Sequence, residues 1–323
     1  MSPPNERTLD FAERQLRNRR ISSFLILGFV AFFVVIGFAV DHLYLGAFVP
    51  GGRWFPFATV AALLVAVAAT ASGYRFGAEL ILKAVGAEPL DPEIPEHREL
   101  RNVVKEMALA SGCPMPRVFV VYDSAPNAFA TGRDENNSAV CITTGLLALL
   151  GREETQGVVA HEIAHIRNRD TRVMMLVSVL LGGVALLADW AQRSLYASRH
   201  GRRGGHWLMA LPALVLIALA PFVGRLMALA VSRQREYLAD AAAVEFTRNP
   251  LGLAKALERI RDAAIPFHKA TRGTAHLFFV NPLPRGLDDR DGSLADLLSS
   301  HPPIDRRIRL LYRMAGLAAP APV

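Results

Sequence analysis

Cysteine and clustered basic motifs are scarce in this chain. Only Cys113 and Cys141 occur among 323 residues, which indicates buried free thiols in a reducing compartment and leaves a disulfide or a metal role as the lesser alternative. The net charge is +7, but no basic module with interleaved aromatic residues is present. We therefore expect no nucleic-acid partner.

Two long segments contain no charged residue. Residues 21–40 and 54–74 are 20 and 21 residues long, so each extends about 30 Å as a helix, the thickness of a bilayer's hydrocarbon core. No small-residue cleavage pattern follows the first segment, which argues against a cleavable signal peptide. The sequence therefore predicts a two-helix anchor in a lipid bilayer at residues 21–74.

Positive charges around this anchor predict its orientation. Five arginines lie within residues 1–20, whereas the connector at 41–53 contains one. Membrane proteins keep most of their arginine and lysine on the cytoplasmic side. We therefore expect residues 1–20 to form a cytoplasmic segment and the chain after Tyr74 to begin in the cytoplasm.

Two shorter apolar stretches, at 173–188 and 207–224, leave two interpretations open. Their lengths of 16 and 18 residues nearly match a bilayer and favour two further spans. The loop between them contains four arginines, which would then lie outside, against the usual rule. The alternative is an apolar hairpin buried in protein, so residues 173–224 are predicted as two membrane or membrane-associated helices.

The rest of the chain predicts a mainly α-helical domain with a small β-sheet, an α+β fold interrupted by residues 173–224. Its first part, 89–172, begins with a proline-rich linker at 89–95, and its second part is 225–314. Residues 315–323 have the composition of a disordered tail. Hydrophobic periodicity and turn residues predict helices at 96–111, 144–150, 153–172, 225–246, 253–265 and 304–314, strands at 118–122 and 139–143, a loop at 123–138 and a mobile loop at 268–291.

The helix predicted at 153–172 carries a metal-binding pattern. His161 and His165 lie one turn apart on one helical face, with Glu162 between them, so both imidazoles can bind one metal ion. With the composition of this chain, the pattern arises by chance in roughly one per cent of shuffled sequences. The spacing is that of a zinc hydrolase, and two ordinary surface or core histidines are the weaker alternative.

The third ligand of such a site is expected from the helix at 225–246. A catalytic zinc takes three protein ligands and leaves one position for water. Glu236 fits this role because Asp240 follows one turn later, where its carboxylate can accept the free ring N–H of a zinc-bound imidazole. The alternative is that this pair forms ion pairs with Arg233 and Arg235 on a solvated helix face.

Glu162 is expected to act as a general base rather than as a ligand, because it points toward the fourth coordination position. Zinc lowers the pKa of bound water toward neutrality, and Glu162 can accept the proton that this water releases. It then returns the proton to the leaving amine after attack on a polarised carbonyl. The predicted reaction is hydrolysis of a peptide bond.

These residues, the run from Arg235 to Asp240, the two N-terminal spans and the apolar stretches between the ligands resemble the HtpX membrane metalloproteases. The same peptidase family contains the CAAX prenyl endopeptidases and the mitochondrial Oma-type proteases. The resemblance extends from Arg14 to about Leu311. It implies a multi-pass protein of the bacterial inner membrane with a gluzincin-like zinc metalloprotease domain, one zinc ion per chain and an active site that faces the cytoplasm.

The resemblance also implies a function and partners. Proteases of this kind degrade misfolded or damaged membrane proteins as part of quality control in the stress response. Protein substrates, mainly membrane proteins, are therefore expected. A homo-oligomer or an association with other membrane proteases is left open.

Asn127, Ala128 and Phe129 match a second pattern of this family. They resemble the edge strand that pairs with the substrate backbone in these proteases and in the related thermolysin-type fold. Main-chain pairing would bind many substrates without selecting one sequence. From the residues alone, an ordinary loop is the favoured alternative.

His301 and Arg307 match the family's C-terminal His-Pro element, whose histidine and arginine reach the active site. The resemblance makes His301 a candidate oxyanion donor and Arg307 a further catalytic residue. Arg306 stands beside Arg307, so the match can shift by one position. A role of His301 at the entry to the last helix is the alternative.

Two other functions remain as alternatives to a quality-control protease. A prenyl-protein endopeptidase would use the same mechanism, but the enzymes of that kind enclose a chamber with more membrane spans than this chain provides. A non-catalytic membrane scaffold would keep zinc for stability, but a structural zinc site has no use for Glu162.

Overall fold

The computed structural model describes most of the chain. The predicted stretch at 207–224 lies outside the described residues, as do 225–232 of the predicted helix 225–246, nearly all of the loop at 268–291, and 320–323 of the predicted tail. The described residues are 11–43, 45, 55–180, 182–184, 233–263, 265, 279 and 302–319.

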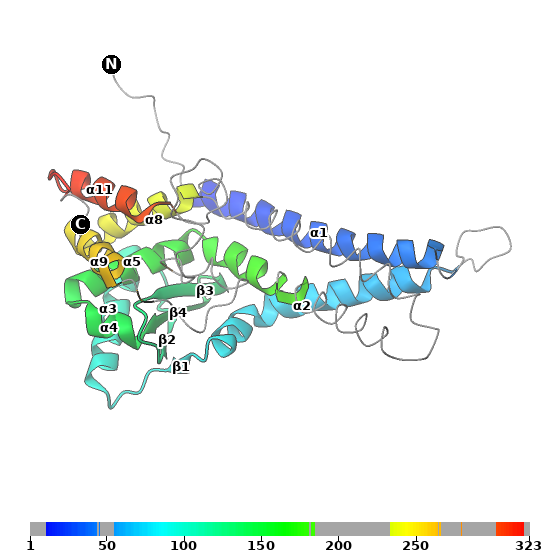
Figure 1. The fold of residues 1–323 in the computed structure, drawn as a ribbon, viewed down its shortest axis with the longest axis horizontal. Helices are drawn as coiled ribbons and strands as arrows, with labels where there is room; N and C mark the ends of the chain where they lie inside the picture. Colours follow the sequence, from blue (N-terminus) through cyan, green and yellow to red (C-terminus); the bar gives the residue numbers. More distant parts are fainter. Residues whose placement is uncertain are drawn as a thin grey trace, which may run out of the picture.

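Two long helices form an arm that extends from the rest of the molecule (Figure 1). They are α1, Phe11–Leu43, and α2, Phe57–Ala84, and both exceed the uncharged runs at 21–40 and 54–74. Gln15–His42 and Phe57–Ala84 are long and apolar enough to span a membrane, and only 11% and 17% of their most apolar windows are buried. A core helix of a soluble protein would be mostly buried, so this exposure supports the two-helix anchor.

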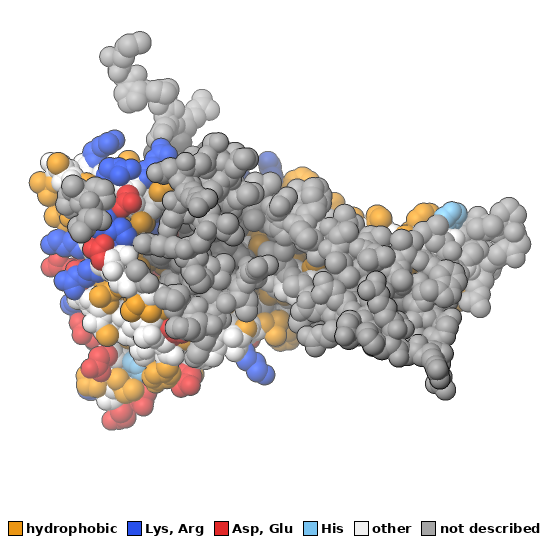
Figure 2. All heavy atoms as spheres, viewed as in Figure 1, with side chains coloured by type: hydrophobic (Ala, Val, Ile, Leu, Met, Phe, Trp, Pro, Cys, Tyr) orange, Lys and Arg blue, Asp and Glu red, His pale blue; other side chains and the backbone are white. Residues whose placement is uncertain are grey.

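Side-chain types divide along the molecule in the same way. Figure 2 shows hydrophobic side chains along the visible parts of the arm, and lysine, arginine, aspartate and glutamate side chains around the opposite end. Large apolar side chains such as Leu64 and Val67 of α2 are at least half exposed. Such an apolar surface is unfavourable in contact with water and is favourable in contact with the hydrocarbon chains of lipids.

Asp41 joins the two helices at the far end of the arm. Its carboxylate accepts hydrogen bonds from the backbone N–H groups of Ala58 and Thr59 at 3.0 and 2.7 Å, and from the Thr59 hydroxyl at 2.7 Å. These N–H groups lie in the first turn of α2, where no acceptor exists within the helix and the helix dipole favours an anion. The carboxylate therefore fixes the start of α2 to the end of α1.

A small mixed sheet lies beside the base of the arm (Figure 1). β2 and β4 are parallel and confirm the two predicted strands, whereas β1–β2 and β3–β4 are antiparallel. The sheet has the order β1-β2-β4-β3 and consists of β1 Glu88–Pro89, β2 Arg117–Val121, β3 Ala128–Asp134 and β4 Asn137–Thr143.

Two of these strands correct the sequence-based expectations. The predicted loop at 123–138 is wrong because β3 forms within it. The first residue of the linker predicted at 89–95 belongs to β1. β3 is rich in alanine and glycine, which have low strand propensity, and it is held by its pairing with β4. Long-range pairing, and not local preference, produces this strand.

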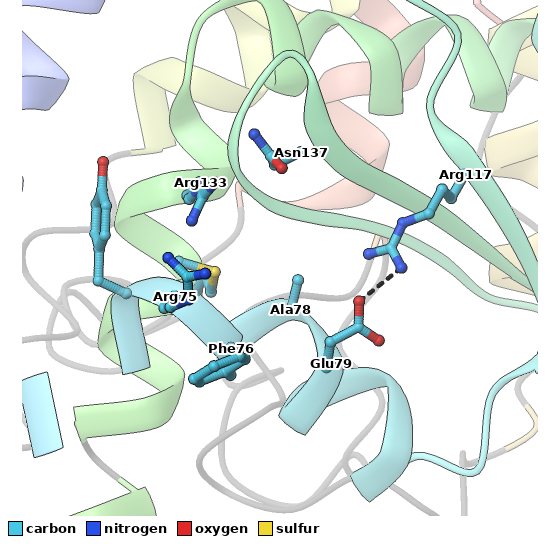
Figure 3. A pocket seen from close by; sticks show the side chains of 9 residues that line it. Arg75, Phe76, Ala78, Glu79, Arg117, Arg133 and Asn137 are labelled. Carbon is cyan, nitrogen blue, oxygen red and sulfur yellow. Dashed lines mark ion pairs between the residues drawn. The ribbon is translucent and has the colours of Figure 1, made fainter. Parts of the chain in front are cut away.

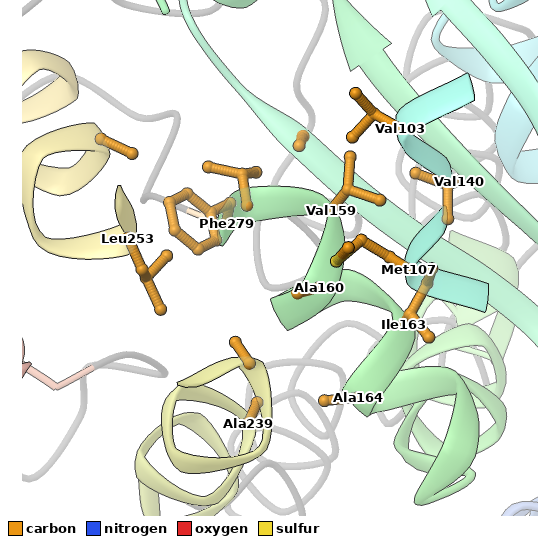
Figure 4. Close-up of a cluster of buried hydrophobic side chains, with 14 of the residues drawn as sticks. Val103, Met107, Val140, Val159, Ala160, Ile163, Ala164, Ala239, Leu253 and Phe279 are labelled. Carbon is orange, nitrogen blue, oxygen red and sulfur yellow. The ribbon is translucent and has the colours of Figure 1, made fainter. Parts of the chain in front are cut away.

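The helices of the domain pack around α5, Arg152–Arg167, in which residues 157–166 are all buried. Figure 4 shows side chains of α3, α5, α8, α9 and β4 converging on one hydrophobic cluster. The domain is mostly helical with a small mixed sheet, as predicted. The other helices are α3 Pro95–Ser111, α4 Thr144–Leu149, α8 Arg233–Thr247, α9 Pro250–Ala263 and α11 Ile304–Met314.

α9 reaches α5 most closely at Gly157, one turn before His161. A Cβ atom at this position would lie 2.7 Å from the backbone nitrogen of Leu253 and 2.8 Å from its Cα. No side chain fits at such distances, so glycine is what allows the two backbones to touch. α9 therefore supports the helix that carries the metal-binding pattern directly.

The helix predicted at 153–172 is wrong in one respect, because α5 ends at Arg167. Asn168 is its C-cap, and Arg169 takes a left-handed conformation with a φ of 59°. Residues 170–180 and 182–184 are helical again. The chain therefore turns at Arg169 and does not run straight from the metal-binding pattern into the next apolar stretch.

The described part of the apolar stretch at 173–188 packs against the arm. It contributes to a hydrophobic cluster that also contains residues of α1 and α2. Full spanning of the bilayer by this stretch stays a prediction. The cluster consists of Val173, Val177, Leu180, Val184, Phe29 and Ala66, with partly buried residues around it.

Candidate metal centre and active site

Three metal-ligating side chains meet between α5 and α8. His161 and His165 come from consecutive turns of α5, Glu236 comes from the first turn of α8, and each is at most 4% exposed. Their ligand atoms all lie within 4.8 Å of one another. The two histidine Nε2 atoms are 3.1 Å apart, and the Glu236 oxygens lie 3.7 Å from His161 Nε2 and 3.6 Å from His165 Nε2.

This donor set fits a tetrahedral divalent ion such as zinc. Zinc binds histidine nitrogen and carboxylate oxygen at about 2.0–2.2 Å, which places neighbouring ligand atoms of a tetrahedron roughly 3.3–3.6 Å apart. The charge fits as well. With both histidines neutral and all carboxylates ionised, four buried carboxylates and two guanidinium groups leave two negative charges for a divalent cation to balance. These groups belong to Glu162, Asp170, Glu236, Asp240, Arg235 and Arg307.

Asp240 holds the ring of His161. Its Oδ1 lies 3.0 Å from His161 Nδ1, so it can accept the ring N–H and leave Nε2 to face a metal. Arg307 of α11 donates to both Asp240 oxygens, at 2.9 Å from Nε and 2.7 Å from Nη2, and its Nη1 lies 3.4 Å from Glu236. The solvated-face alternative for Glu236 and Asp240 is therefore wrong, because both are buried.

Asp170 contacts the ring of His165 in the way that Asp240 contacts the ring of His161. The sequence pattern does not predict this contact. Its Oδ2 lies 3.1 Å from His165 Nδ1, and the side chain is 3% exposed. In a continuous helix, a residue five positions along lies about 140° around the axis, away from His165. The turn at Arg169 brings Asp170 back to the ring.

Burial and neighbouring charges set the pKa values of the two histidines apart. Burial lowers the pKa of His161 to about 4, against the opposing effect of Asp240. Burial also acts to lower the pKa of His165, but the hydrogen bond to Asp170 and the charge of Glu236 outweigh it and raise the pKa to about 9. A metal binds the neutral imidazole, so metal binding at neutral pH must displace a proton from His165.

Glu162 lies beside these donors and is 2% exposed. Burial, and to a smaller extent the charge of Glu236, raises its pKa to about 7. The backbone amide of Ala130 in β3 hydrogen-bonds to its carboxylate. A carboxyl group with a pKa near neutrality both accepts and releases a proton readily at pH 7, which suits general acid–base catalysis.

β3 brings the predicted substrate-binding residues to the edge of the sheet next to α5. The Asn127 carbonyl accepts the N–H of Thr143 from β4, so the carbonyl of the following residue, Ala128, points to the outer edge. There it accepts the backbone N–H of Phe279 at 2.8 Å. Phe129 instead points into a hydrophobic cluster below the sheet.

Phe279 also contacts two residues of the candidate site, His161 and Arg307. Its ring lies 4.9 Å from the ring of His161, edge to face, and the Arg307 guanidinium carbon lies 4.9 Å from the centre of the same ring. The Phe279 carbonyl accepts a hydrogen bond from Arg307 Nη1 at 3.4 Å. Phe279 is not identified from the sequence, because no local pattern relates it to His161, 118 positions away.

Of the two predicted C-terminal site residues, His301 and Arg307, the structure describes Arg307. Arg307 is 2% exposed inside the site, whereas Arg306 is exposed, with its guanidinium 5.6 Å from the centre of the Tyr237 ring. His301 lies outside the described residues. Of the two arginines, the structure therefore brings Arg307 to the metal ligands.

A separate cavity of about 330 Å³ lies where the sheet meets α2. Figure 3 shows Arg75 and Glu79 of α2 facing Arg117 and Arg133 of the sheet across this cavity, and Glu79 forms an ion pair with Arg117 at 2.6 Å. Its lining includes none of the described residues of the predicted metal and catalytic sites. The cavity is therefore distinct from the candidate metal centre.

The two cysteines take no part in the donor set. Both are free thiols, as predicted, but only Cys141 is buried, whereas Cys113 is half-buried. Burial raises the pKa of each thiol, which disfavours the thiolate that a metal would need.

A buried His-His-Glu donor set with a glutamate beside it on the same helix is the arrangement of a hydrolase site. Comparison with known families agrees with this class, because the model of Peptidase family M48 matches residues 95–315. The chain belongs to peptidase family M48.

Curated relatives support the same assignment over nearly the whole chain. The chain is 38% identical to "Protease HtpX homolog" of Dictyoglomus turgidum over 95% of each chain. It is 45% identical to the protein of that name from Dictyoglomus thermophilum, over 75% of this chain and 77% of the relative, and 35% identical to that from Streptococcus gordonii, over 94% and 99%. The resemblance to the HtpX proteases is confirmed.

A solved structure with a similar chain is that of Ste24p from S. mikatae. The two chains have a TM-score of 0.48 and 15% sequence identity, over 93% of this chain and 67% of that chain.

The donor set predicts that removal of the Glu236 carboxylate weakens metal binding. Wild-type protein dialysed against zinc should retain one ion per chain, and Glu236→Gln should bind it at least ~10-fold more weakly, since an amide carries no charge to offset the ion. Glu245→Gln, an exposed position on the same helix, is the control. Elemental analysis after a chelator titration measures the difference, and equal zinc affinity in the two variants would contradict the assignment.

Proposed function

We propose that this M48 family member is a zinc-dependent membrane endopeptidase with one zinc ion per chain. The observation that carries the proposal is the position of Glu162, a buried carboxyl group with a pKa of about 7 directly beside three converging donors. Structural zinc sites use four protein ligands, whereas three ligands leave a position for water. A base next to that position serves hydrolysis and not structure.

The chemistry follows from the residues of the site. When bound, zinc lowers the pKa of a water molecule and polarises the carbonyl group of the scissile peptide bond. Glu162 accepts a proton from that water and donates it to the nitrogen of the leaving amine. His301 as oxyanion donor remains a prediction from the family resemblance.

Carboxylates behind the two histidines prepare them for this role. Asp240 and Asp170 accept the Nδ1 protons and so present both Nε2 atoms toward the same point. Burial acts to raise the pKa of Asp240, but Arg307 outweighs it and holds the pKa below its ordinary value. In this proposal Arg307 keeps Asp240 ionised, and with it the tautomer of His161.

Substrate is proposed to bind as an additional strand along the outer edge of β3. The Ala128 carbonyl already accepts a backbone N–H of Phe279 at this edge, which supports its ability to bind an extended chain. The Glu162 carboxylate is tied to Ala130 two residues along the same strand, so a chain bound there would pass next to the proton-transfer group. A substrate strand would have to replace the Phe279 bond.

Competition between Phe279 and substrate predicts a change in KM. Phe279→Pro cannot donate an N–H to Ala128, whereas Phe279→Ala keeps this donor and serves as the matched control. One net backbone hydrogen bond is worth about 0.5–1.5 kcal/mol, so KM for an extended peptide should be about 2- to 10-fold lower in Phe279→Pro than in Phe279→Ala. Equal KM values in steady-state cleavage assays would remove the edge-strand proposal.

Loss of the base predicts loss of cleavage with zinc retained. Glu162→Gln removes the proton acceptor but none of the three donors, so activity should fall by about 10²–10⁴-fold at unchanged zinc content. The control is Glu153→Gln on the exposed start of the same helix. Cleavage of casein and of a membrane-protein substrate is measured with zinc present, and wild-type activity in Glu162→Gln would end the proposed mechanism.

We place this enzyme in the bacterial inner membrane with its active site on the cytoplasmic side, where misfolded or damaged membrane proteins are its proposed substrates. The arginine-rich N-terminal segment and the two exposed apolar helices support this location.

Protease added outside spheroplasts should cut the loop at Arg202 and Arg203 if 173–188 and 207–224 both cross the bilayer. Protection of that loop would contradict the four-span topology.

A further inference from the structure

α1 extends beyond its apolar run and contacts residues that lie next to the candidate metal centre. The uncharged segment begins at residue 21, yet the helix begins at Phe11, so almost three helical turns precede the predicted membrane span. Two amide side chains on these turns, Gln15 and Asn18, contact the end of α5. The membrane anchor and the catalytic helix are therefore in direct contact.

These amides satisfy the last carbonyl groups of α5. Gln15 Nε2 donates to the Arg167 carbonyl at 2.8 Å, and Asn18 Nδ2 donates to the Asn168 carbonyl at 2.9 Å. The final carbonyls of a helix have no donor within the helix, so a buried helix end needs partners from elsewhere. Here α1 supplies them.

Asn18 also binds the aspartate that faces His165. The same Nδ2 donates to Asp170 Oδ1 at 2.7 Å, while the other Asp170 oxygen lies 3.1 Å from His165 Nδ1. Arg235 Nε lies 3.6 Å from Oδ1. All four side chains are at most 4% exposed, so these contacts are shielded from bulk solvent.

Asn18 also bonds to both sides of the turn at Arg169, which brings Asp170 to His165. Its amide bonds residues 168 and 170, which flank the left-handed Arg169 on both sides. Left-handed backbone is unfavourable for arginine and persists only when neighbouring contacts hold it. Without the Asn18 bonds, Asp170 loses both a partner and a constraint on its position.

We propose that Asn18 is a positioning residue of the catalytic centre, which holds Asp170 and through it the metal-facing imidazole of His165. The first membrane helix is then a structural part of the metal site as well as an anchor. The catalytic meaning of this inference rests on the proposed zinc peptidase function. Its effect on metal binding is measurable without any substrate.

The test uses full-length protein in detergent or nanodiscs and compares two buried positions of α1. Asn18→Leu removes the amide at similar volume, and Ser22→Ala, one turn along, is the control because the Ser22 hydroxyl bonds only to the Asn18 carbonyl among the contacts of the described residues. Changes behind a ligating histidine weaken metal binding by about 10–100-fold. We expect Asn18→Leu to weaken zinc binding about 10-fold in a chelator competition, and Ser22→Ala to leave it unchanged.

Further readouts separate positioning from a general loss of stability. In Asn18→Leu the rise in Tm on zinc addition should shrink, KM should stay constant, and kcat should recover in excess zinc. Asn18→Ala, which also removes the donor and adds no charge, should show the same changes if Asn18→Leu folds poorly. A merely structural role would lower Tm equally with and without zinc.

A double-mutant cycle with Asp170→Asn decides whether Asn18 acts through Asp170. We expect Asn18→Leu to have little further effect on zinc affinity in the Asp170→Asn background, because residues that act in series are not additive. Wild-type zinc affinity in Asn18→Leu, or the same fold-loss in both backgrounds, overturns the inference. Zinc binding without cleavage in the wild type would refute the proposed function and leave this inference standing.

Discussion

Ionisable side chains are buried at the centre of the domain, where each one needs a partner of opposite charge or a hydrogen bond. A buried charge is stable only when it is paired or hydrogen-bonded. Here each of the two histidines has its own partners: His161 contacts Asp240, which is held by Arg307, and His165 contacts Asp170, which is held by α1. These contacts tie α1, α5, α8 and α11 together, so folding the domain and arranging the donors are one event.

Local sequence patterns predict the parts of this arrangement that lie on single helices. The spacing of His161 and His165 requires only the period of an α-helix, and uncharged runs mark α1 and α2 because a bilayer has a fixed thickness. Glu236 is predicted as the third ligand because a catalytic zinc site needs three protein ligands. Asp240, one helical turn away, supports this choice because it can accept the ring N–H of a ligating histidine. The structure brings His161, His165 and Glu236 together, and Asp240 contacts His161.

The rest depends on contacts between distant parts of the chain, which no local pattern contains. β3 has a composition that disfavours strands and forms because β4 pairs with it. Asp170 reaches His165 because α5 ends at Arg167 and the chain turns at the left-handed Arg169. The residues on either side of Arg169 bond to Asn18 of α1, 150 and 152 positions away. The bond between Phe279 and Ala128 is of the same kind.

The proposed function requires one zinc ion bound to His161, His165 and Glu236 at the end of this network. X-ray absorption at the zinc edge of purified full-length protein measures the ligands directly. We expect the zinc ion to have only nitrogen and oxygen neighbours at about 2.0–2.2 Å, together with the more distant scattering of two imidazole rings. Sulfur at about 2.3 Å, or a first shell without imidazole, would place the ion elsewhere and contradict it.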